Sequence, residues 1–182
     1  ANHSGRGQSL CAHHVLGWVA LKEGKGKEAL SHFGRVQSMS VAPQALAAAF
    51  SLVGDEARAV PLWHMAASTS NDPTLRHELA GALLRAGRES DARRLPEVRM
   101  SLAWTAAERV WTLRGELEKA AYAAESAFQA EPGAELAYDA ACAWARTGQA
   151  GSAMRMLQLA AQNGFDEAEL AVEDPDLSSL RD

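Results

Sequence analysis

The sequence has few aromatic residues, few cysteines and no long apolar run. Aromatic residues make up 6% of the 182 residues, and the two cysteines, Cys11 and Cys142, lie far apart in the chain. No stretch approaches the roughly 18 uninterrupted apolar residues of a membrane-spanning helix. We therefore expect no direct membrane insertion. We also expect reduced thiols and a cytoplasmic location, either as a free chain or as a soluble domain of a larger or membrane-anchored protein.

The motifs that carry familiar chemistry are also absent. The sequence contains no glycine-rich phosphate loop, no G-x-S-x-G, no H-E-x-x-H and no C-x-x-C. A net charge of −5 disfavours a general affinity for nucleic acid. No sustained alternation of apolar and polar residues indicates a sheet. These absences predict a helical chain that is not an enzyme and has no cofactor, no metal and no nucleic-acid partner.

What the sequence does contain is a regular series of glycines. Five of them follow stretches rich in Ala and Leu, and each is followed four to five residues later by Ala. Their spacings are 30, 33, 28 and 33 residues: Gly24, Gly54, Gly87, Gly115 and Gly148. A period near 30 to 35 residues is the mark of a helical repeat array. We expect each glycine to end one helix of a pair in the left-handed conformation that only Gly adopts cheaply.

The blocks around these glycines resemble the tetratricopeptide repeat. That family's pattern places Trp, Leu-Gly and Tyr on a first helix, then Ala, Phe and Ala on a second, then Pro, over about 34 residues. The first block matches at Leu16-Gly17, Ala29 and Phe33. The fourth block matches most fully, at Trp104, Ala107, Trp111, Ala120, Ala124, Ala127 and Pro132. The resemblance covers residues 10–165, and the shorter spacings make it a divergent array. The closing DPDLSSLR is similar to the ending of many bacterial arrays.

The resemblance implies an all-α fold, a right-handed α-solenoid of about five antiparallel helical hairpins. The array spans residues 8–164, residues 165–182 form a C-terminal cap, and residues 1–7 are disordered or a cloning remnant. Expected helices cover about 8–22, 26–38, 43–53, 55–68, 73–86, 101–114, 116–130, 134–147 and 150–163. Phe165, Leu170, Leu177 and Leu180 are the expected packing residues of the cap.

Two places in this scheme are irregular. Pro61 falls inside an expected helix and should kink it. Pro96 stands in the middle of residues 88–100, where a full second helix would otherwise lie. Either that helix is short and ends near Arg94, or Pro96 begins a long helix that continues to Leu113.

In the family the first helix of each pair lines a concave groove. Carrying that register onto this sequence gives His14, Trp18, His77, Arg109 and Tyr138 as the partner-binding residues. Trp18 is an expected anchor, with ordinary packing as its alternative. The Lys and Asn residues with which some members clamp chaperone tails are replaced here, for example by His14 and Trp18, so that partner is not expected.

Other groups of polar residues have simpler interpretations. Cys11, His13 and His14 cluster, but adjacent histidines on a helix point about 100° apart, and the two residues that share a face fall short of a zinc site. Glu135 and Asp139 lie four apart on one helix face. Paired carboxylates can perform acid–base catalysis, yet an exposed helical surface explains them better.

The sequence therefore predicts a protein-interaction module that holds a peptide or protein segment in a concave groove. Two alternatives stay open. The chain can be the regulatory or scaffold domain of a larger bacterial enzyme, such as a membrane protease or a kinase, that contacts its own catalytic part. It can also be a homodimerisation domain.

Overall fold

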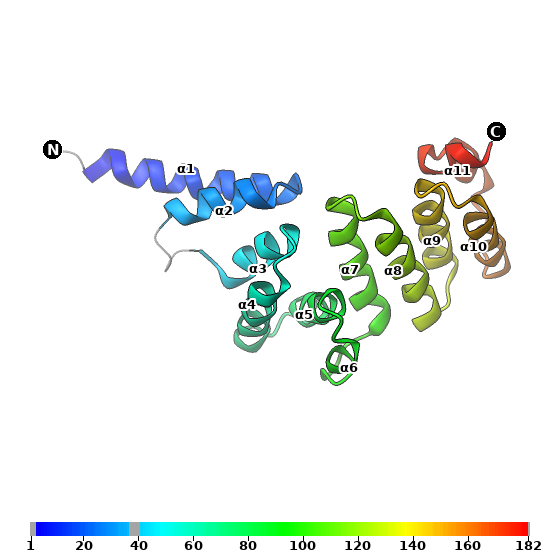
Figure 1. Ribbon diagram of the computed structural model, residues 1–182, viewed down its shortest axis with the longest axis horizontal. Coiled ribbons are helices and arrows are strands. Elements are labelled where there is room, and N and C mark those ends of the chain that lie inside the picture. The colour runs from blue at the N-terminus through cyan, green and yellow to red at the C-terminus, as the bar shows by residue number, and fades with distance from the viewer. Residues whose placement is uncertain (1–2, 37–40, 182) are drawn as a thin grey trace. The chain divides into compact units, whose positions relative to one another are not determined.

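The computed structural model describes residues 3–36 and 41–181, and those residues form helices, turns and short connections only (Figure 1). Of the side chains in these ranges, those of residues 3–9, 168 and 170 are not described. The chain divides into two compact units, Ala1–Glu97 and Val98–Asp182. The expected all-α fold with packed neighbouring helices is confirmed in each unit.

The N-terminal unit contains five helices of ten residues or more and one short helix. They are α1 (His3–Lys22), α2 (Gly26–Arg35), α3 (Pro43–Leu52), α4 (Glu56–Thr69), α5 (Pro73–Arg85) and α6 (Glu89–Ala92). Each helix packs against the next one in the chain. The described part of the segment expected to be disordered is helical, because α1 begins at His3. Residues 37–38 of the second expected helix lie outside the described residues.

The C-terminal unit contains two helix pairs and a closing segment. They are α7 (Met100–Leu113), α8 (Leu117–Ala130), α9 (Ala134–Arg146), α10 (Ala150–Gln162), α11 (Ala168–Glu173) and the 3₁₀-helix η2 (Pro175–Leu180). α7 packs on α8, α8 on α9, and α9 on α10. η2 then packs on both α9 and α10. Leu177 is buried there, and Phe165 and Leu180 pack on the same core. Leu170 lies outside the described side chains.

The five glycines end the first helices of the pairs, as the spacing predicts. Their φ angles are +72°, +84°, +71°, +75° and +76° in chain order. Each glycine N–H donates to the carbonyl three residues earlier, and the next N–H donates to the carbonyl five residues earlier, as in Gly115 to Thr112 and Glu116 to Trp111. This pair of hydrogen bonds is the Schellman motif, and it gives partners to carbonyls that a helix end would otherwise leave unpaired.

The irregular region around Pro96 holds the boundary between the two units. α6 has four residues and ends at Ala92, and α7 begins only at Met100. The expectation of a short second helix is therefore confirmed, and the long helix beginning at Pro96 does not form. Glu97 has a φ of +57°, a left-handed conformation that non-glycine residues rarely adopt. Pro61 lies inside α4, which runs through it to Thr69.

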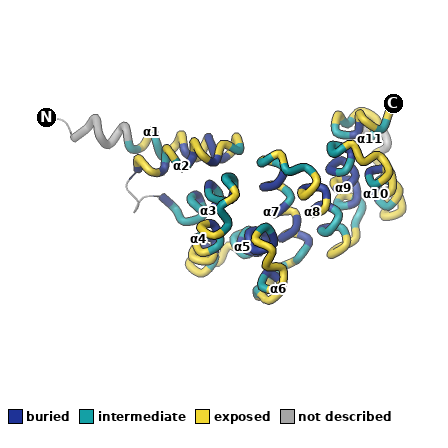
Figure 2. The backbone as a smooth tube through the Cα atoms, in the orientation of Figure 1, coloured by how far each residue is buried: buried dark blue, intermediate teal, exposed yellow. Residues whose placement is uncertain are grey.

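Small residues allow the helices of a pair to approach closely. Alanines dominate the buried positions, and most described helices have buried residues on one side and exposed residues on the other (Figure 2). The closest approach is at Gly17, where an added Cβ would lie 2.6 Å from Phe33 Cδ1 on α2. Trp63, Trp104 and Trp111 are buried, and Trp144 is partly buried against the core of the C-terminal unit. Among the described residues, no helix combines the length and apolar character that crossing a membrane requires.

Candidate functional site

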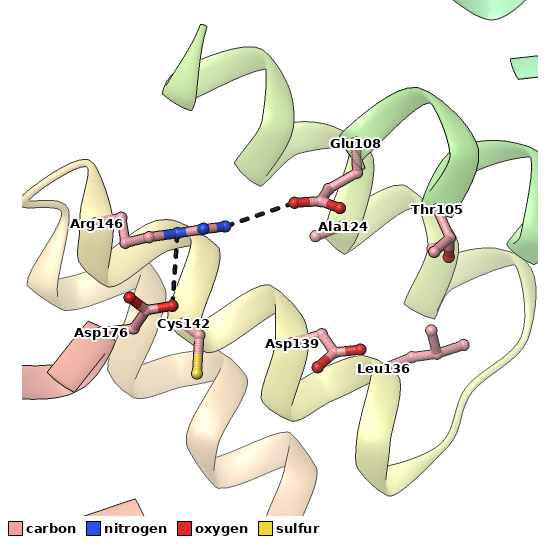
Figure 3. A pocket seen from close by; sticks show the side chains of 9 residues that line it. Thr105, Glu108, Ala124, Leu136, Asp139, Cys142, Arg146 and Asp176 are labelled. Atoms are coloured by element: carbon pink, nitrogen blue, oxygen red, sulfur yellow. Dashed lines mark hydrogen bonds and ion pairs between the residues drawn. The ribbon is translucent and has the colours of Figure 1, made fainter. Parts of the chain in front are cut away.

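A cavity opens in the C-terminal unit between the first helices of its two pairs. Its volume is about 250 Å³. Thr105 and Glu108 line it from α7, while Ala124 and Ala127 line it from α8. The remaining lining residues come from α9 and η2: Leu136, Asp139, Cys142, Arg146 and Asp176 (Figure 3). Alanines on α8 leave room that larger side chains would fill.

Three charged side chains of the cavity are linked by ion pairs, with Arg146 at their centre. Arg146 Nη2 lies 3.4 Å from Glu108 Oε1, and Arg146 Nε lies 3.7 Å from Asp176 Oδ2. Thr112 Oγ1 also donates to Glu108 Oε1, at 2.7 Å. Arg146 thus joins α9 to α7 and to η2, and it neutralises part of the negative charge.

Asp139 also lines the cavity but forms no ion pair with Arg146. In Figure 3 it faces the same space as Thr105 and Glu108, from the opposite helix. The structure gives it no hydrogen bond or ion pair with any described residue. Asp139 is exposed on the cavity wall. Partial desolvation of its carboxyl raises its pKa, and the charges of Glu108 and Glu135 raise it further, against the lowering effect of Arg146. The cavity therefore holds a carboxylate that a cation would stabilise.

A shallower trough continues from this cavity along the ends of the same helices. It has a volume of about 480 Å³ and shares Thr105 and Leu136 with the cavity. Glu131 on its wall accepts hydrogen bonds from Arg99 and, at 2.5 Å, from Ser101 Oγ. The hydrogen bond from Arg99 and then that from Ser101 lower the pKa of Glu131. The trough thus presents hydroxyls and paired charges next to a cavity with an unpaired carboxylate.

The closing segment shields the neighbouring face of α9. Tyr138 OH donates to Asp174 Oδ2 at 2.7 Å, and its ring stacks on Phe165 at 4.3 Å between centroids. Cys142 Sγ lies 3.6 Å from the same Asp174 oxygen. Burial and then the Asp174 charge raise the pKa of Cys142 to about 12, so this thiol is not a nucleophile at neutral pH.

The five residues predicted from the family register are divided between the two units, His14, Trp18 and His77 in the N-terminal unit and Arg109 and Tyr138 in the C-terminal unit. Of these, the structure brings His14 and Trp18 together: Trp18 Nε1 donates to His14 Nε2 at 3.1 Å. His77 lies elsewhere in the N-terminal unit, half-buried on α5. Arg109 is exposed on α7 and lines neither cavity nor trough, and Tyr138 is buried under the closing segment.

The residues that do line the cavity lie one position away from two of those predicted. Glu108 precedes Arg109, and Asp139 follows Tyr138, which is a rotation of about 100° around a helix. One signal in the sequence could have found them. On the alanine-rich α9, polar residues recur at spacings of four, three and four on one face: Glu135, Asp139, Cys142 and Arg146.

The histidine cluster separates as its spacing predicts. His13 Nδ1 lies 2.9 Å from His32 Nδ1 on α2, whereas His14 pairs with Trp18. Both cysteines are free, Cys11 exposed and Cys142 buried. Within the described ranges, no group of three or more His, Cys, Asp and Glu side chains is arranged to hold a metal ion.

Comparison with known proteins adds no further constraint on the site. No family model matches the sequence, and no curated protein matches it.

Proposed function

We propose that the C-terminal unit binds a peptide or protein segment that inserts a Lys or Arg side chain into the cavity between α7 and α9. The observation that carries this proposal is the unpaired Asp139 carboxylate beside Glu108, with a pKa raised by partial desolvation and by like charges. A cationic side chain would stabilise the ionised carboxylate, because it supplies hydrogen-bond donors in place of water and a positive charge that offsets the neighbouring negative charges.

The dimensions of the site favour a side chain over a small-molecule cofactor. Ligand pockets usually enclose about 300–1,000 Å³. The cavity, at about 250 Å³, is smaller than that range but accommodates one long side chain. The adjoining trough is open, and its lining residues come mainly from the loop before α9 and from the first turns of α7 and α9. A linear segment therefore fits the shape better than a compact metabolite.

We further propose that the helix pairs belong to a right-handed solenoid of about five tetratricopeptide-type hairpins. Its support is the repetition of one helix ending, with a left-handed glycine and a Schellman motif, at all five expected positions. The Gly17–Phe33 contact adds a second family feature, because a Leu-Gly pair on a first helix approaches the aromatic residue of the second.

Fluorescence polarisation with defined peptides tests the binding proposal. The probes are fluorescein-labelled twelve-residue peptides of Ala, Ser and Leu that differ only in a central Lys, Arg, Gln or Glu. The Lys and Arg peptides should bind about tenfold more tightly than the Gln peptide, as one charge-assisted hydrogen bond to a partly solvated carboxylate implies. The Glu peptide should bind weakest.

Two variants locate the binding. Asp139→Asn should remove the preference for Lys and Arg. Glu118→Gln should keep it, because Glu118 is an exposed carboxylate on α8 that lines neither cavity nor trough. Equal affinity of the Lys and Gln peptides, or an unchanged preference in Asp139→Asn, would overturn the proposal.

A further inference from the structure

We propose that the chain forms a symmetric dimer through an exposed apolar face of α1. This inference does not depend on the cavity of the C-terminal unit. Val15, Leu16 and Val19 lie on one side of the helix and are 59%, 45% and 44% exposed, with Trp18 at the edge of the face at 38%. The other exposed large apolar residues are scattered over several helices. An apolar cluster of this kind marks an interaction surface.

The register of the repeats shows what this face is built to contact. When the blocks are aligned on their glycines, Leu16 and Val19 correspond to Ala140 and Ala143 of α9. Both alanines are buried, and α9 receives the preceding helix α8.

Leu16 and Val19 also align with buried residues of a later first helix in the N-terminal unit. There the corresponding residues are Leu79 and Ala82 of α5, which are buried, and α5 packs on the preceding helix α4. Leu16 and Val19 therefore lie on the side of α1 that corresponds to the stacking side of later first helices, on which those helices receive a neighbouring helix.

Among the described residues, the last hairpin of the repeat series has its outer face covered. η2 packs on both α9 and α10 and buries Leu177, so it occupies the place where a further hairpin would stack. Head-to-tail association of copies therefore lacks an acceptor. When one stacking face is available, self-association pairs that face with itself and stops at two copies.

The charge distribution agrees with self-pairing. In a two-fold arrangement, residues near the axis face their own copies, so a charged residue there would repel itself. Residues 7–21 contain no Asp, Glu, Lys or Arg. The two histidines of this stretch are occupied within their own chain, His13 with His32 and His14 with Trp18.

The size of the face sets the expected affinity. α1 has 20 residues and spans about 30 Å. The exposed apolar residues lie between positions 15 and 19, so the pairing covers only part of that length and lies at or below the low end of specific interfaces. We therefore expect a dissociation constant in the micromolar range or weaker and rapid exchange between monomer and dimer.

Sedimentation equilibrium of the 182-residue chain from about 1 to 500 μM tests the proposal, since weak interfaces associate in that range. The mean mass should rise with concentration from the monomer value of 19.4 kDa towards twice that value. The variants Leu16→Asp and Val19→Asp should stay monomeric throughout. Val172→Asp is the matched control, because Val172 is 68% exposed on α11 and should leave association unchanged.

The helix content and melting of each variant, followed by circular dichroism, separate lost association from lost folding. If an Asp variant unfolds α1, Val15→Lys gives the same test at the most exposed position. A wild-type chain that is monomeric at every concentration would overturn the dimer. Association that survives in the folded Leu16→Asp, Val19→Asp or Val15→Lys variants would also overturn it.

Discussion

Single glycines in this chain have different roles according to their backbone conformation, and two of them allow a direct comparison. Gly115 ends α7 with a φ of +75°, whereas Gly151 lies inside α10, and a Cβ at either position would meet nothing within 4 Å. Gly115→Ala should destabilise the chain by about 1 kcal/mol, because only the left-handed backbone opposes the methyl group. Gly151→Ala should be neutral or stabilise by up to about 1 kcal/mol. Urea denaturation of both variants measures the difference, and equal effects would contradict it.

Asp139 should make binding of a cationic peptide depend on pH. Its pKa in the folded chain is raised above the value of about 3.9 for a free Asp side chain. The carboxyl is neutral below its folded pKa and ionised above it, so affinity for the Lys peptide should fall as pH drops through that raised pKa. The fall begins at a higher pH than an ordinary Asp would give, and polarisation titrations from pH 7 to pH 4 would show it. In Asp139→Asn the profile should lose this step.

The same raised pKa predicts an opposite effect on stability. A carboxyl with a raised pKa binds its proton more tightly in the folded state, so its ionisation costs stability at neutral pH. Asp139→Asn should therefore raise the melting temperature of the free chain at pH 7 while it weakens peptide binding. That combination distinguishes a binding residue from a structural one.

At the residue scale, local chemistry made the backbone conformations predictable from the sequence. The left-handed glycines follow from local chemistry, because no other residue adopts that conformation cheaply. Arg109 and Tyr138 were placed by analogy with the family, and the cavity is lined by the residue before Arg109, Glu108, and by the residue after Tyr138, Asp139. Tyr138 also depends on Asp174 and Phe165, which are distant in sequence, and no local pattern signals that contact.

Within the N-terminal unit, three helices are joined by one buried guanidinium. Arg85 on α5 donates to Glu56 on α4 at 2.8 Å and to Ser51 on α3 at 2.9 Å. The Arg85 side chain is 0% exposed and that of Glu56 is 10% exposed. Arg85→Leu should cost about 3–5 kcal/mol, because it leaves the Glu56 carboxylate buried without its partner.

The matching double variant tests the origin of that cost. Arg85→Leu/Glu56→Leu should recover much of the loss, since no unpaired charge then remains. Denaturant unfolding of the two single variants and the double variant gives the coupling energy. A double variant that is less stable than Arg85→Leu alone would show that the ion pair is not the main contribution.

Weaker packing of the closing segment should increase the reactivity of the Cys142 thiol. Leu177 packs η2 onto the core formed by α9 and α10, and Cys142 lies in the same core. Thiol titration with a coloured disulfide at pH 8 should show two phases, a fast one for exposed Cys11 and a slow one for Cys142, whose pKa is raised to about 12. Leu177→Ala should accelerate the slow phase, while Leu113→Ala, at an exposed position, should leave it unchanged. Equal rates for both thiols in the wild type would contradict the shielding.

At the scale of elements, the helices were predictable to within a few residues except at the two ends and around Pro96. Ala and Leu spacing, Asp72-Pro73 and Asp174-Pro175 mark their boundaries by local chemistry. Asp72 indeed accepts from Thr74 N, and Asp174 from Asp176 N. The early start of α1 was not predictable, because HSGRGQS contains no apolar spacing that marks a helix face.

At the scale of the whole molecule, the chain consists of two compact units that meet at Glu97 and Val98. Helical repeat chains are stabilised by contacts between neighbouring elements, so a local perturbation spreads over few of them. Arg85→Leu should therefore accelerate amide hydrogen exchange in α3, α4 and α5, and Leu177→Ala in α9 and α10. Because the two positions lie in different units, their destabilisations should add to within about 0.5 kcal/mol. Hydrogen exchange with mass spectrometry separates the units by peptide, and equal acceleration in both units from either variant would mean that the chain unfolds as one cooperative body.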